Sequence, residues 1–127
     1  MIFGIGTDIV RVSRVADGLN RFGERFARRI ATEQELAEWR GHPRPAHYLA
    51  KRFAAKEAAA KALGTGFRDG LSLRHIGVVP DPLGKPTLAF YGRGADLIKE
   101  MGIGEAFVSL SDEDDYAVAY VVLTRGG

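Results

Sequence analysis

An acid and a base four residues apart are the side chains best suited to chemistry in this 127-residue sequence. Glu57 and Lys61 lie on one face of any helix, because side chains four positions apart are neighbours on a helix surface. The residues that follow Glu57, Ala58 to Ala60, are small, as expected if another backbone or a ligand approaches the charged pair closely. A solvent-exposed ion pair is the common alternative for this spacing. The pair alone therefore does not distinguish a functional site from an ordinary surface ion pair.

Asp8 is the second candidate. It follows an apolar segment and precedes Ile9 and Val10, and a carboxylate is costly to bury there without a partner. The alternative is an aspartate that caps a turn or a helix. Together with Glu57 and the nearby Lys61, however, Asp8 suits Mg²⁺, which binds one or two carboxylates and completes its shell with waters and substrate phosphate oxygens.

Composition narrows the class of protein. At 127 residues with 46% hydrophobic and 27% charged content, we expect one soluble globular domain over residues 1–127. The chain has no cysteine, which excludes disulfides and thiolate metal sites. Its first residues show neither a signal peptide nor a membrane span. We therefore expect a cytoplasmic protein with no membrane partner.

The charge is unevenly distributed. Residues 1–66 hold 12 Lys and Arg against 7 Asp and Glu, whereas residues 67–127 hold 6 against 9. A basic half suits a nucleic acid, an acidic protein or a phosphorylated small molecule. Phe22, Phe26 and Trp39 fall on apolar helical stripes instead of alternating with the arginines, which argues against nucleic acid. A noncatalytic oligomeric scaffold is a further alternative, but it leaves Asp8 unexplained.

Standard nucleotide and metal motifs are absent. The glycines at Gly4 and Gly64 lack the third glycine of a dinucleotide fingerprint, and the Gly84–Lys85 pair is followed by proline, which excludes a phosphate-binding loop. The three histidines have no metal-ligand spacing.

The first half of the chain is predicted to be mostly helical. Residues 2–10 favour a short buried strand, interrupted by glycines where another segment passes close. Apolar residues three or four apart over 12–30 predict helix, and the glycines within that range predict a break into two short helices. Thr32 and Glu35 form a capping-box pattern for a helix through about Trp39. The strong helix formers of 46–63 predict one long helix that ends at Gly64.

The second half is predicted to be mostly strand. Residues 76–79 and 87–91 flank a Pro-Asp-Pro-Leu-Gly turn, residues 94–101 indicate a short helix, and residues 107–111 and 116–123 flank an acidic turn. The resulting class is α+β, a mostly antiparallel sheet with one long helix and several short helices. The last strand is apolar on both faces, which favours burial in a subunit interface, since a small domain has little interior to cover both.

Two segments carry a family resemblance. The residues Gly4–Val10 and Arg52–Gly66 together resemble the holo-acyl-carrier-protein synthases, small bacterial 4′-phosphopantetheinyl transferases. The resemblance extends over nearly the whole chain, through Gly84–Pro86, Val108–Ser111 and Tyr116–Ala119. It implies an enzyme of fatty acid biosynthesis that transfers 4′-phosphopantetheine from coenzyme A to a serine of apo-acyl carrier protein and releases adenosine 3′,5′-bisphosphate.

The resemblance also implies roles for particular residues. Asp8 and Glu57 would bind Mg²⁺, Lys61 would contact the pyrophosphate, and the enzyme would be a homotrimer with sites at the subunit interfaces. Many relatives have histidines at the positions of Phe107 and Asp112, so a proton-transfer role for those histidines does not carry over to this chain.

Other charged residues suggest a base for the reaction and contacts for the two substrates. Glu57, or a metal-bound water that it orients, is the best candidate base for the serine proton. Three basic residues could bind the 3′-phosphate of coenzyme A, with simple helix solvation as the alternative: Arg44, Arg52 and Lys56. Four arginines spaced along 14–28 are expected on one face, opposite the apolar stripe, where they would bind the acidic carrier protein: Arg14, Arg21, Arg25 and Arg28.

Overall fold

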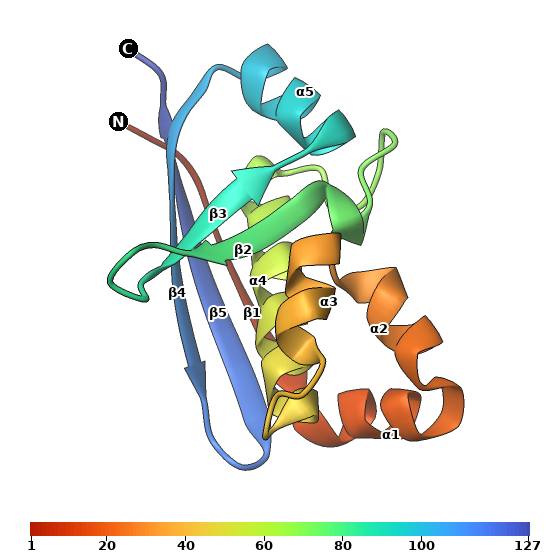
Figure 1. The fold of residues 1–127 in the computed structure, drawn as a ribbon. Coiled ribbons are helices and arrows are strands. Elements are labelled where there is room, and N and C mark those ends of the chain that lie inside the picture. Colours follow the sequence, from red (N-terminus) through yellow and green to blue (C-terminus); the bar gives the residue numbers. More distant parts are fainter.

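The computed structural model describes residues 1–127 and is built around a three-stranded antiparallel sheet in the order β1–β5–β4, with the helices on one of its faces (Figure 1). A separate two-stranded antiparallel sheet is formed by β2 and β3. The elements in chain order are β1 (Ile2–Arg11), α1 (Val12–Phe22), α2 (Glu24–Ile30), α3 (Glu33–Trp39), α4 (Pro45–Leu63), a 3₁₀ turn η1 (Leu73–His75), β2 (Ile76–Pro80), β3 (Pro86–Phe90), α5 (Gly92–Glu100), β4 (Ile103–Asp112) and β5 (Tyr116–Arg125). The predicted α+β class is confirmed.

Helix α4 packs directly against β1 and β5 because the facing residues are small. The α4 alanines 54, 55 and 58–60 are buried, and so are the alanines of β5 that face them, Ala117 and Ala119. A β-carbon on Gly4 would overlap the carbonyl oxygen of Ala62, and one on Gly6 would overlap that of Ala58. The glycines of β1 therefore admit the backbone of α4, as the sequence predicted for a segment passing close to this strand.

The N-terminal helices follow the predicted pattern with one exception. Gly23, with a φ of 58°, separates α1 from α2, and Thr32 and Glu35 form the predicted capping box at the start of α3. The predicted apolar stripe is buried at Val12 and Val15, but Phe22 is 48% exposed. The stripe fails at Phe22 because α1 ends at this residue and the chain turns away at Gly23.

The expectation that β1 is a buried strand is wrong. β1 is an edge strand that pairs only with β5, and Ile2, Ile5 and Ile9 are more than half exposed. Gly4, Gly6 and Asp8 face α4, whereas Ile5, Thr7 and Ile9 alternate to the opposite face. The outer face of the sheet carries further exposed aromatic residues, Phe107, Tyr116 and Tyr120.

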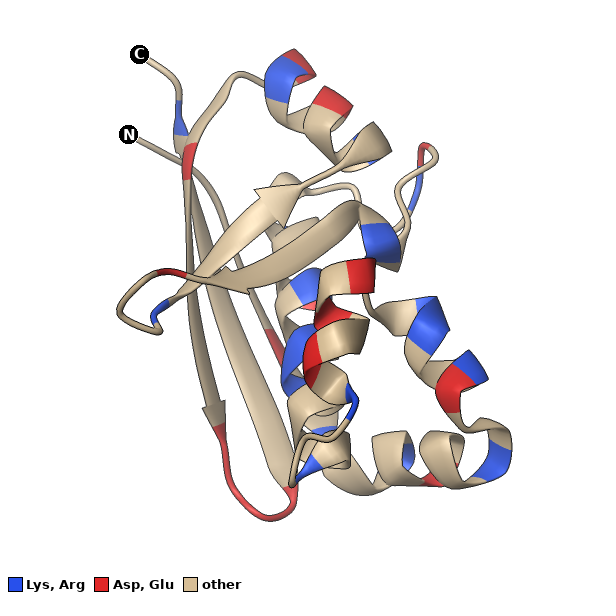
Figure 2. Ribbon diagram, in the orientation of Figure 1, with Lys and Arg blue, Asp and Glu red and all other residues tan.

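The β2–β3 hairpin projects beside β4 and ends in a tight turn (Figure 1). The Asp81 carboxylate accepts hydrogen bonds from the backbone N–H groups of Leu83 (2.8 Å) and Lys85 (2.9 Å), which fixes the turn. Between β4 and β5, the acidic turn predicted at 112–115 forms one end of the molecule (Figure 2). No helix is long and apolar enough to cross a membrane.

Candidate active site

Asp8, Glu57 and Lys61 come together where α4 crosses β1. The Lys61 ammonium donates to the Asp8 carboxylate (3.0 Å) and to the backbone carbonyl of Thr7 (3.0 Å). The Asp8 side chain is 17% exposed and that of Lys61 is 52% exposed. Asp8 lies within the strand, paired in register with Ala119, and does not begin a helix or close a turn. The alternative of a capping aspartate is therefore excluded.

The electrostatics of this cluster suit a cation. Burial raises the pKa of the Glu57 carboxyl, and the negative charge of Asp8 raises this pKa further, while Lys61 opposes the shift. Two carboxylates that repel each other at a partly open surface favour a bound cation, which would relieve the repulsion. Asp8 and Glu57 offer hard oxygen ligands, and an ion bound by them would complete its shell with water and substrate oxygens, as Mg²⁺ commonly does. The residues present thus fit this ion.

An apolar groove begins next to the carboxylates. It has a volume of about 300 Å³ and is lined by Val10, Arg14, Val15, Phe26, Arg29, Ile30, Phe53 and Leu73. Val10 lies two residues after Asp8 on the same face of β1, and Phe53 lies one helical turn before Glu57 on α4. The groove therefore lies between the two elements that carry the carboxylates and Arg14 of α1 and Arg29 of α2.

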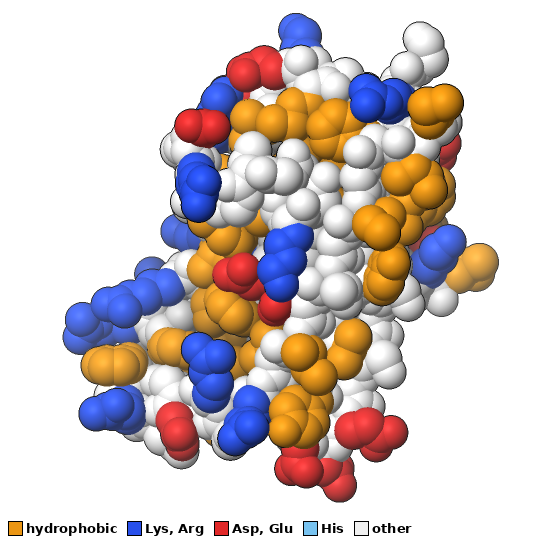
Figure 3. Space-filling view, turned by 180° about the vertical axis from the view of Figure 1, so that it is seen from behind, with side chains coloured by type: hydrophobic (Ala, Val, Ile, Leu, Met, Phe, Trp, Pro, Cys, Tyr) orange, Lys and Arg blue, Asp and Glu red, His pale blue; other side chains and the backbone are white.

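The predicted arginines are all exposed, but they do not share one continuous helical face. The break at Gly23 places Arg14 and Arg21 on α1 and Arg25 and Arg28 on α2. The surface at this end of the molecule is strongly basic, with hydrophobic side chains between the charges (Figure 3). Arg14 lines the apolar groove and does not lie opposite the apolar residues, which corrects the expected arrangement.

Two details of this basic surface were not predicted. Arg28 is paired with Glu24 on its own helix (2.8 Å), so part of its charge is already neutralised. Arg29 lines the groove together with Arg14 and belongs with the predicted set. Its signal in the sequence was its spacing of one helical turn from the apolar Phe26, but the prediction considered only the spacing of the arginines from one another.

Within one chain, Arg44 and Arg52 do not reach the carboxylate cluster. Arg44 precedes α4 and lies near His47 (2.9 Å) and the Asp114 carboxylate (3.6 Å) of the β4–β5 turn. The guanidinium of Arg52 lies over the Tyr48 ring, 4.2 Å from its centroid, and 3.7 Å from Glu38 of α3. Its Nε has no hydrogen-bond partner. These arginines are thus near the end of α4 that faces α3 and the acidic turn, away from Lys61.

The expectation that Lys56 contacts phosphate is wrong. Its side chain is fully buried, and its ammonium donates to the Glu35 carboxylate (2.8 Å) and to the carbonyls of Leu73 (3.0 Å) and Ile76 (2.6 Å). Burial lowers the pKa of Lys56, and the Glu35 charge counteracts this. An ammonium has three donors and these contacts use all three, so none remains for a ligand.

A second hollow lies between the β2–β3 hairpin and the sheet. It has a volume of about 330 Å³, and its lining includes a cation, two hydroxyls and two aromatic rings: Lys85, Thr87, Ser109, Phe107 and Tyr120. Phe107, one of the two positions where the family resemblance suggested a histidine, therefore provides an apolar wall. Asp112, the other such position, is 3.4 Å from Lys51. Phe107 has no titratable group, so it cannot take the proton-transfer role of a histidine.

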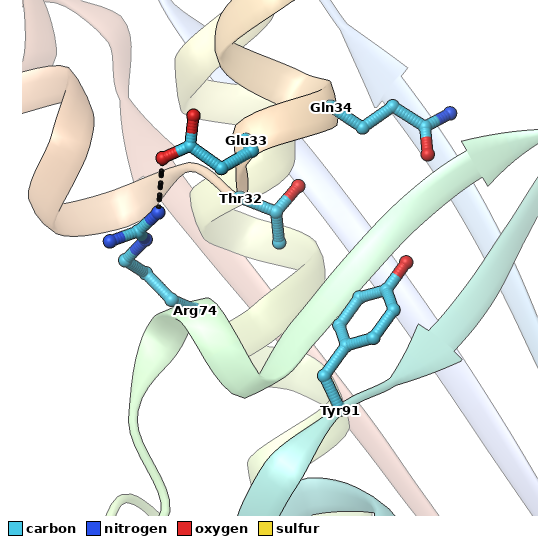
Figure 4. Close-up of a pocket in the computed structure, with 5 residues that line it drawn as sticks. All are labelled: Thr32, Glu33, Gln34, Arg74 and Tyr91. Carbon is cyan, nitrogen blue, oxygen red and sulfur yellow. Dashed lines mark hydrogen bonds and ion pairs between the residues drawn. The ribbon is translucent and has the colours of Figure 1, made fainter.

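A third hollow, of about 370 Å³, is lined by Thr32, Glu33, Gln34, Arg74 and Tyr91 (Figure 4). The Arg74 guanidinium is occupied there by Glu33 (2.8 Å) and by the carbonyl of Ala31 (3.1 Å). None of the predicted site residues lines this hollow.

Comparison with known proteins identifies the family. The model of the 4′-phosphopantetheinyl transferase superfamily matches residues 4–121, a range that contains the carboxylates and Lys61. The chain belongs to this superfamily. It is 55% identical to a holo-[acyl-carrier-protein] synthase of Halorhodospira halophila over 126 residues, covering 99% of this chain and all of the relative.

Solved structures of the family agree with the fold. The chain superimposes on holo-[acyl-carrier-protein] synthase from Neisseria meningitidis with a TM-score of 0.93 and 47% identity, covering 98% of this chain and 100% of the other. It also superimposes on the Helicobacter pylori enzyme in complex with coenzyme A, with a TM-score of 0.83 and 28% identity over 94% and 99% of the two chains. The phosphopantetheinyl transferase fold predicted from the sequence is therefore confirmed.

Proposed function

We propose that this protein transfers 4′-phosphopantetheine from coenzyme A to a serine of apo-acyl carrier protein at a site built on Asp8, Glu57 and Lys61. The observation that carries the proposal is the convergence of these side chains at the crossing of α4 and β1 in a member of the 4′-phosphopantetheinyl transferase superfamily. In fatty acid biosynthesis this reaction converts the apo carrier into its holo form.

Each of the three side chains has a role. Asp8 and Glu57 would hold Mg²⁺, which supplies charge neutralisation for the pyrophosphate of coenzyme A. Lys61, held against Asp8 and the Thr7 carbonyl, would place a compact positive charge beside the leaving phosphate. Transfer to an oxygen nucleophile depends chiefly on such positioning and charge stabilisation.

Glu57 is the proposed base. As the serine oxygen attacks the phosphorus next to the pantetheine arm, the bond from that phosphorus to the bridging oxygen breaks, and adenosine 3′,5′-bisphosphate leaves. The serine proton passes to the Glu57 carboxylate. Burial and the charge of Asp8 raise the pKa of Glu57 in the metal-free site. A metal-bound water that Glu57 orients is the alternative proton acceptor.

The carrier protein would bind along α1 and α2. The apolar groove is lined by Arg14 and Arg29 and by Val10 and Phe53, which lie on the same elements as Asp8 and Glu57, so a carrier bound there could present its serine at Glu57. An acidic carrier is the partner that this basic surface fits electrostatically.

The hollow between hairpin and sheet would bind the nucleotide half of coenzyme A. Lys85 offers a cation for phosphate, and Phe107 and Tyr120 offer apolar walls for a base. Arg44 and Arg52 are the candidates for the 3′-phosphate. None of these residues adjoins the carboxylates of its own chain, which supports a site shared between subunits.

A homotrimer would provide such a shared site. The outer face of the sheet exposes Ile5, Ile9, Phe107, Tyr116 and Tyr120, each at least 41% accessible. An apolar face of this extent is typical of a subunit interface, and the family resemblance supplies the number three. A cytoplasmic location remains a prediction from the sequence.

The experiment that tests the function is direct. The protein is mixed with coenzyme A, Mg²⁺ and an apo-acyl carrier protein, and the carrier is weighed by mass spectrometry. We expect the mass of one phosphopantetheine group to be added to the carrier and adenosine 3′,5′-bisphosphate to be released. An unmodified carrier, with a known synthase active under the same conditions, would refute the proposal.

A further inference from the structure

Lys56 and Glu35 form a buried ion pair that the proposed chemistry does not use. Their side chains are 0% and 1% exposed. The Glu35 carboxylate accepts hydrogen bonds from the backbone N–H groups of Thr32 (2.9 Å) and Val78 (2.8 Å) in addition to its contact with Lys56. Taking two charges out of water is costly, and stability alone rarely explains such a pair, because apolar residues of the same size often serve as well.

The pair is bonded to one edge of the β2–β3 hairpin. The backbone N–H of Tyr91 donates to the His75 carbonyl and that of Asp81 donates to the Lys85 carbonyl, each at 2.8 Å. These bonds mark the odd-numbered residues of β2 as those that face β3. The backbone groups of Ile76 and Val78 therefore point away from β3, toward a side where no strand lies.

Lys56 and Glu35 occupy the place of a neighbouring strand at this edge. The Lys56 ammonium donates to the Ile76 carbonyl (2.6 Å), and the Glu35 carboxylate accepts from the Val78 N–H (2.8 Å). These are two of the backbone groups that a third strand would have bonded. The side-chain pair thus ties the hairpin to α4 and α3, and Lys56 extends the tie to η1 through the Leu73 carbonyl.

We infer that Lys56 and Glu35 are positioning residues that hold the β2–β3 hairpin against the body of the enzyme and so set the affinity for coenzyme A. The inference rests on the proposed function, in which the hairpin residues Lys85 and Thr87 form one wall of the nucleotide hollow and the sheet forms the other. Neither residue of the pair touches the substrate. Their effect is on the distance between the two walls.

A double variant tests this inference. Lys56→Met/Glu35→Gln removes both charges at nearly constant volume, so no unpaired buried charge remains, and the amide introduced on α3 keeps an acceptor for the Val78 N–H. The lost contacts are those from Lys56 to the Ile76 and Leu73 carbonyls and one N–H acceptor, because the amide has one oxygen where the Glu35 carboxylate accepts from both Thr32 and Val78. We expect the Kd and KM for coenzyme A to rise about tenfold, with kcat and the carrier KM within about twofold of wild type, and hydrogen exchange in β2 to accelerate.

A matched control is available on the same elements. Arg74 and Glu33 also join η1 to α3 (2.8 Å), but their side chains are 45% and 80% exposed, and they line the hollow of Figure 4 instead. Arg74→Met/Glu33→Gln changes the same charges, and we expect wild-type values of KM, kcat and hydrogen exchange. A general loss of folded protein would instead reduce kcat and act on both substrates alike.

The outcomes separate the two proposals. If the Lys56→Met/Glu35→Gln variant shows wild-type hydrogen exchange in β2 and wild-type affinity for coenzyme A, the positioning role is refuted while the proposed function stands. If kcat falls with unchanged affinity for coenzyme A, the pair acts on the chemistry and the positioning role is again refuted. If wild type neither binds coenzyme A nor modifies the carrier, the proposed function fails, and so does the link between the pair and coenzyme A. Amide hydrogen exchange in β2 then decides whether the pair holds the hairpin.

Discussion

Lys61 shows how one side chain connects two elements at the site. Its ammonium reaches from α4 to β1, where it meets both the Asp8 carboxylate and the Thr7 carbonyl. Because these contacts hold the charge in place before substrate arrives, little reorganisation is needed when the phosphoryl group transfers.

Replacing Lys61 should therefore slow transfer much more than it weakens binding. We expect Lys61→Ala to lower kcat about 10²-fold or more, the usual scale for one preorganised charge contact. Lys61→Arg should not restore the rate fully, because a planar fork replaces a compact point charge. Steady-state kinetics measures both, with Lys99→Ala, an exposed lysine of α5, as the control. Wild-type kcat in Lys61→Ala would show that this helix face is wrongly assigned.

Helical spacing predicted that Glu57 and Lys61 lie together on α4, whereas Asp8 on the distant β1 was joined to them through its unusual setting and the family resemblance. Lys56 was misassigned for a physical reason. Helix α4 is buried on several sides, so helical spacing does not distinguish its solvent face from its core. Glu35, the residue that neutralises Lys56, lies on a different helix, α3, and no local pattern pairs the two.

At the scale of elements, the site depends on how closely α4 approaches β1. Gly4 and Gly6 leave room for the α4 backbone at Ala62 and Ala58. The same approach brings Glu57 and Lys61 to Asp8. The glycines were predicted to admit a close neighbour, but which element would be that neighbour depends on the tertiary fold.

Gly6→Ala should separate the two elements. The added methyl group would meet the carbonyl of Ala58, and neither backbone can move away without disturbing its own hydrogen bonds. We expect a loss of about 2 kcal/mol or more in the free energy of unfolding, near the upper part of the range for overpacking. Urea denaturation measures this, with Gly127→Ala, where nothing lies within 4 Å, as the control. Unchanged stability would contradict the packing described.

The basic surface of α1 and α2 predicts substrate-specific kinetics. Arg14→Glu and Arg21→Glu should raise the KM for the carrier protein and leave that for coenzyme A nearly unchanged. The effect should shrink at high salt, because the Debye length falls to about 3 Å at 1 M. Arg68→Glu, at an exposed arginine after α4, makes the same charge change elsewhere. Equal losses for both substrates would indicate misfolding, and no loss for either would exclude docking on this surface.

At the scale of the whole molecule, one chain holds the parts of the site in separate places. The carboxylates lie where α4 crosses β1, and the nucleotide hollow lies between hairpin and sheet. The apolar outer face of the sheet was predicted in part, from the two-sided apolar pattern of the last strand. The sequence did not predict that β1 contributes Ile5 and Ile9 to this face. Its apolar residues and glycines resemble those of a buried strand.

Trimeric assembly would bring these parts together. We expect light scattering at micromolar concentration to return three times the 13.8 kDa of one chain. Tyr120→Glu places a charge on the 46% exposed outer-face tyrosine and should shift the protein toward monomer. Phe22→Glu, at an aromatic residue of similar exposure on α1, should stay trimeric. A monomeric wild type would contradict the shared site.

We propose above that Asp8 and Glu57 together make the chain a metal-dependent transferase. The most direct measurement follows phosphopantetheine transfer to the apo carrier by mass spectrometry for wild type, Asp8→Ala and Glu57→Ala, with Asp96→Ala, an exposed carboxylate of α5, as the control. We predict that both site variants fold like wild type by circular dichroism but lose transfer about 10²-fold or more. Asp96→Ala should retain transfer. Excess chelator should abolish wild-type transfer until Mg²⁺ is restored. Undiminished transfer by either site variant, or by wild type in chelator, would contradict the account.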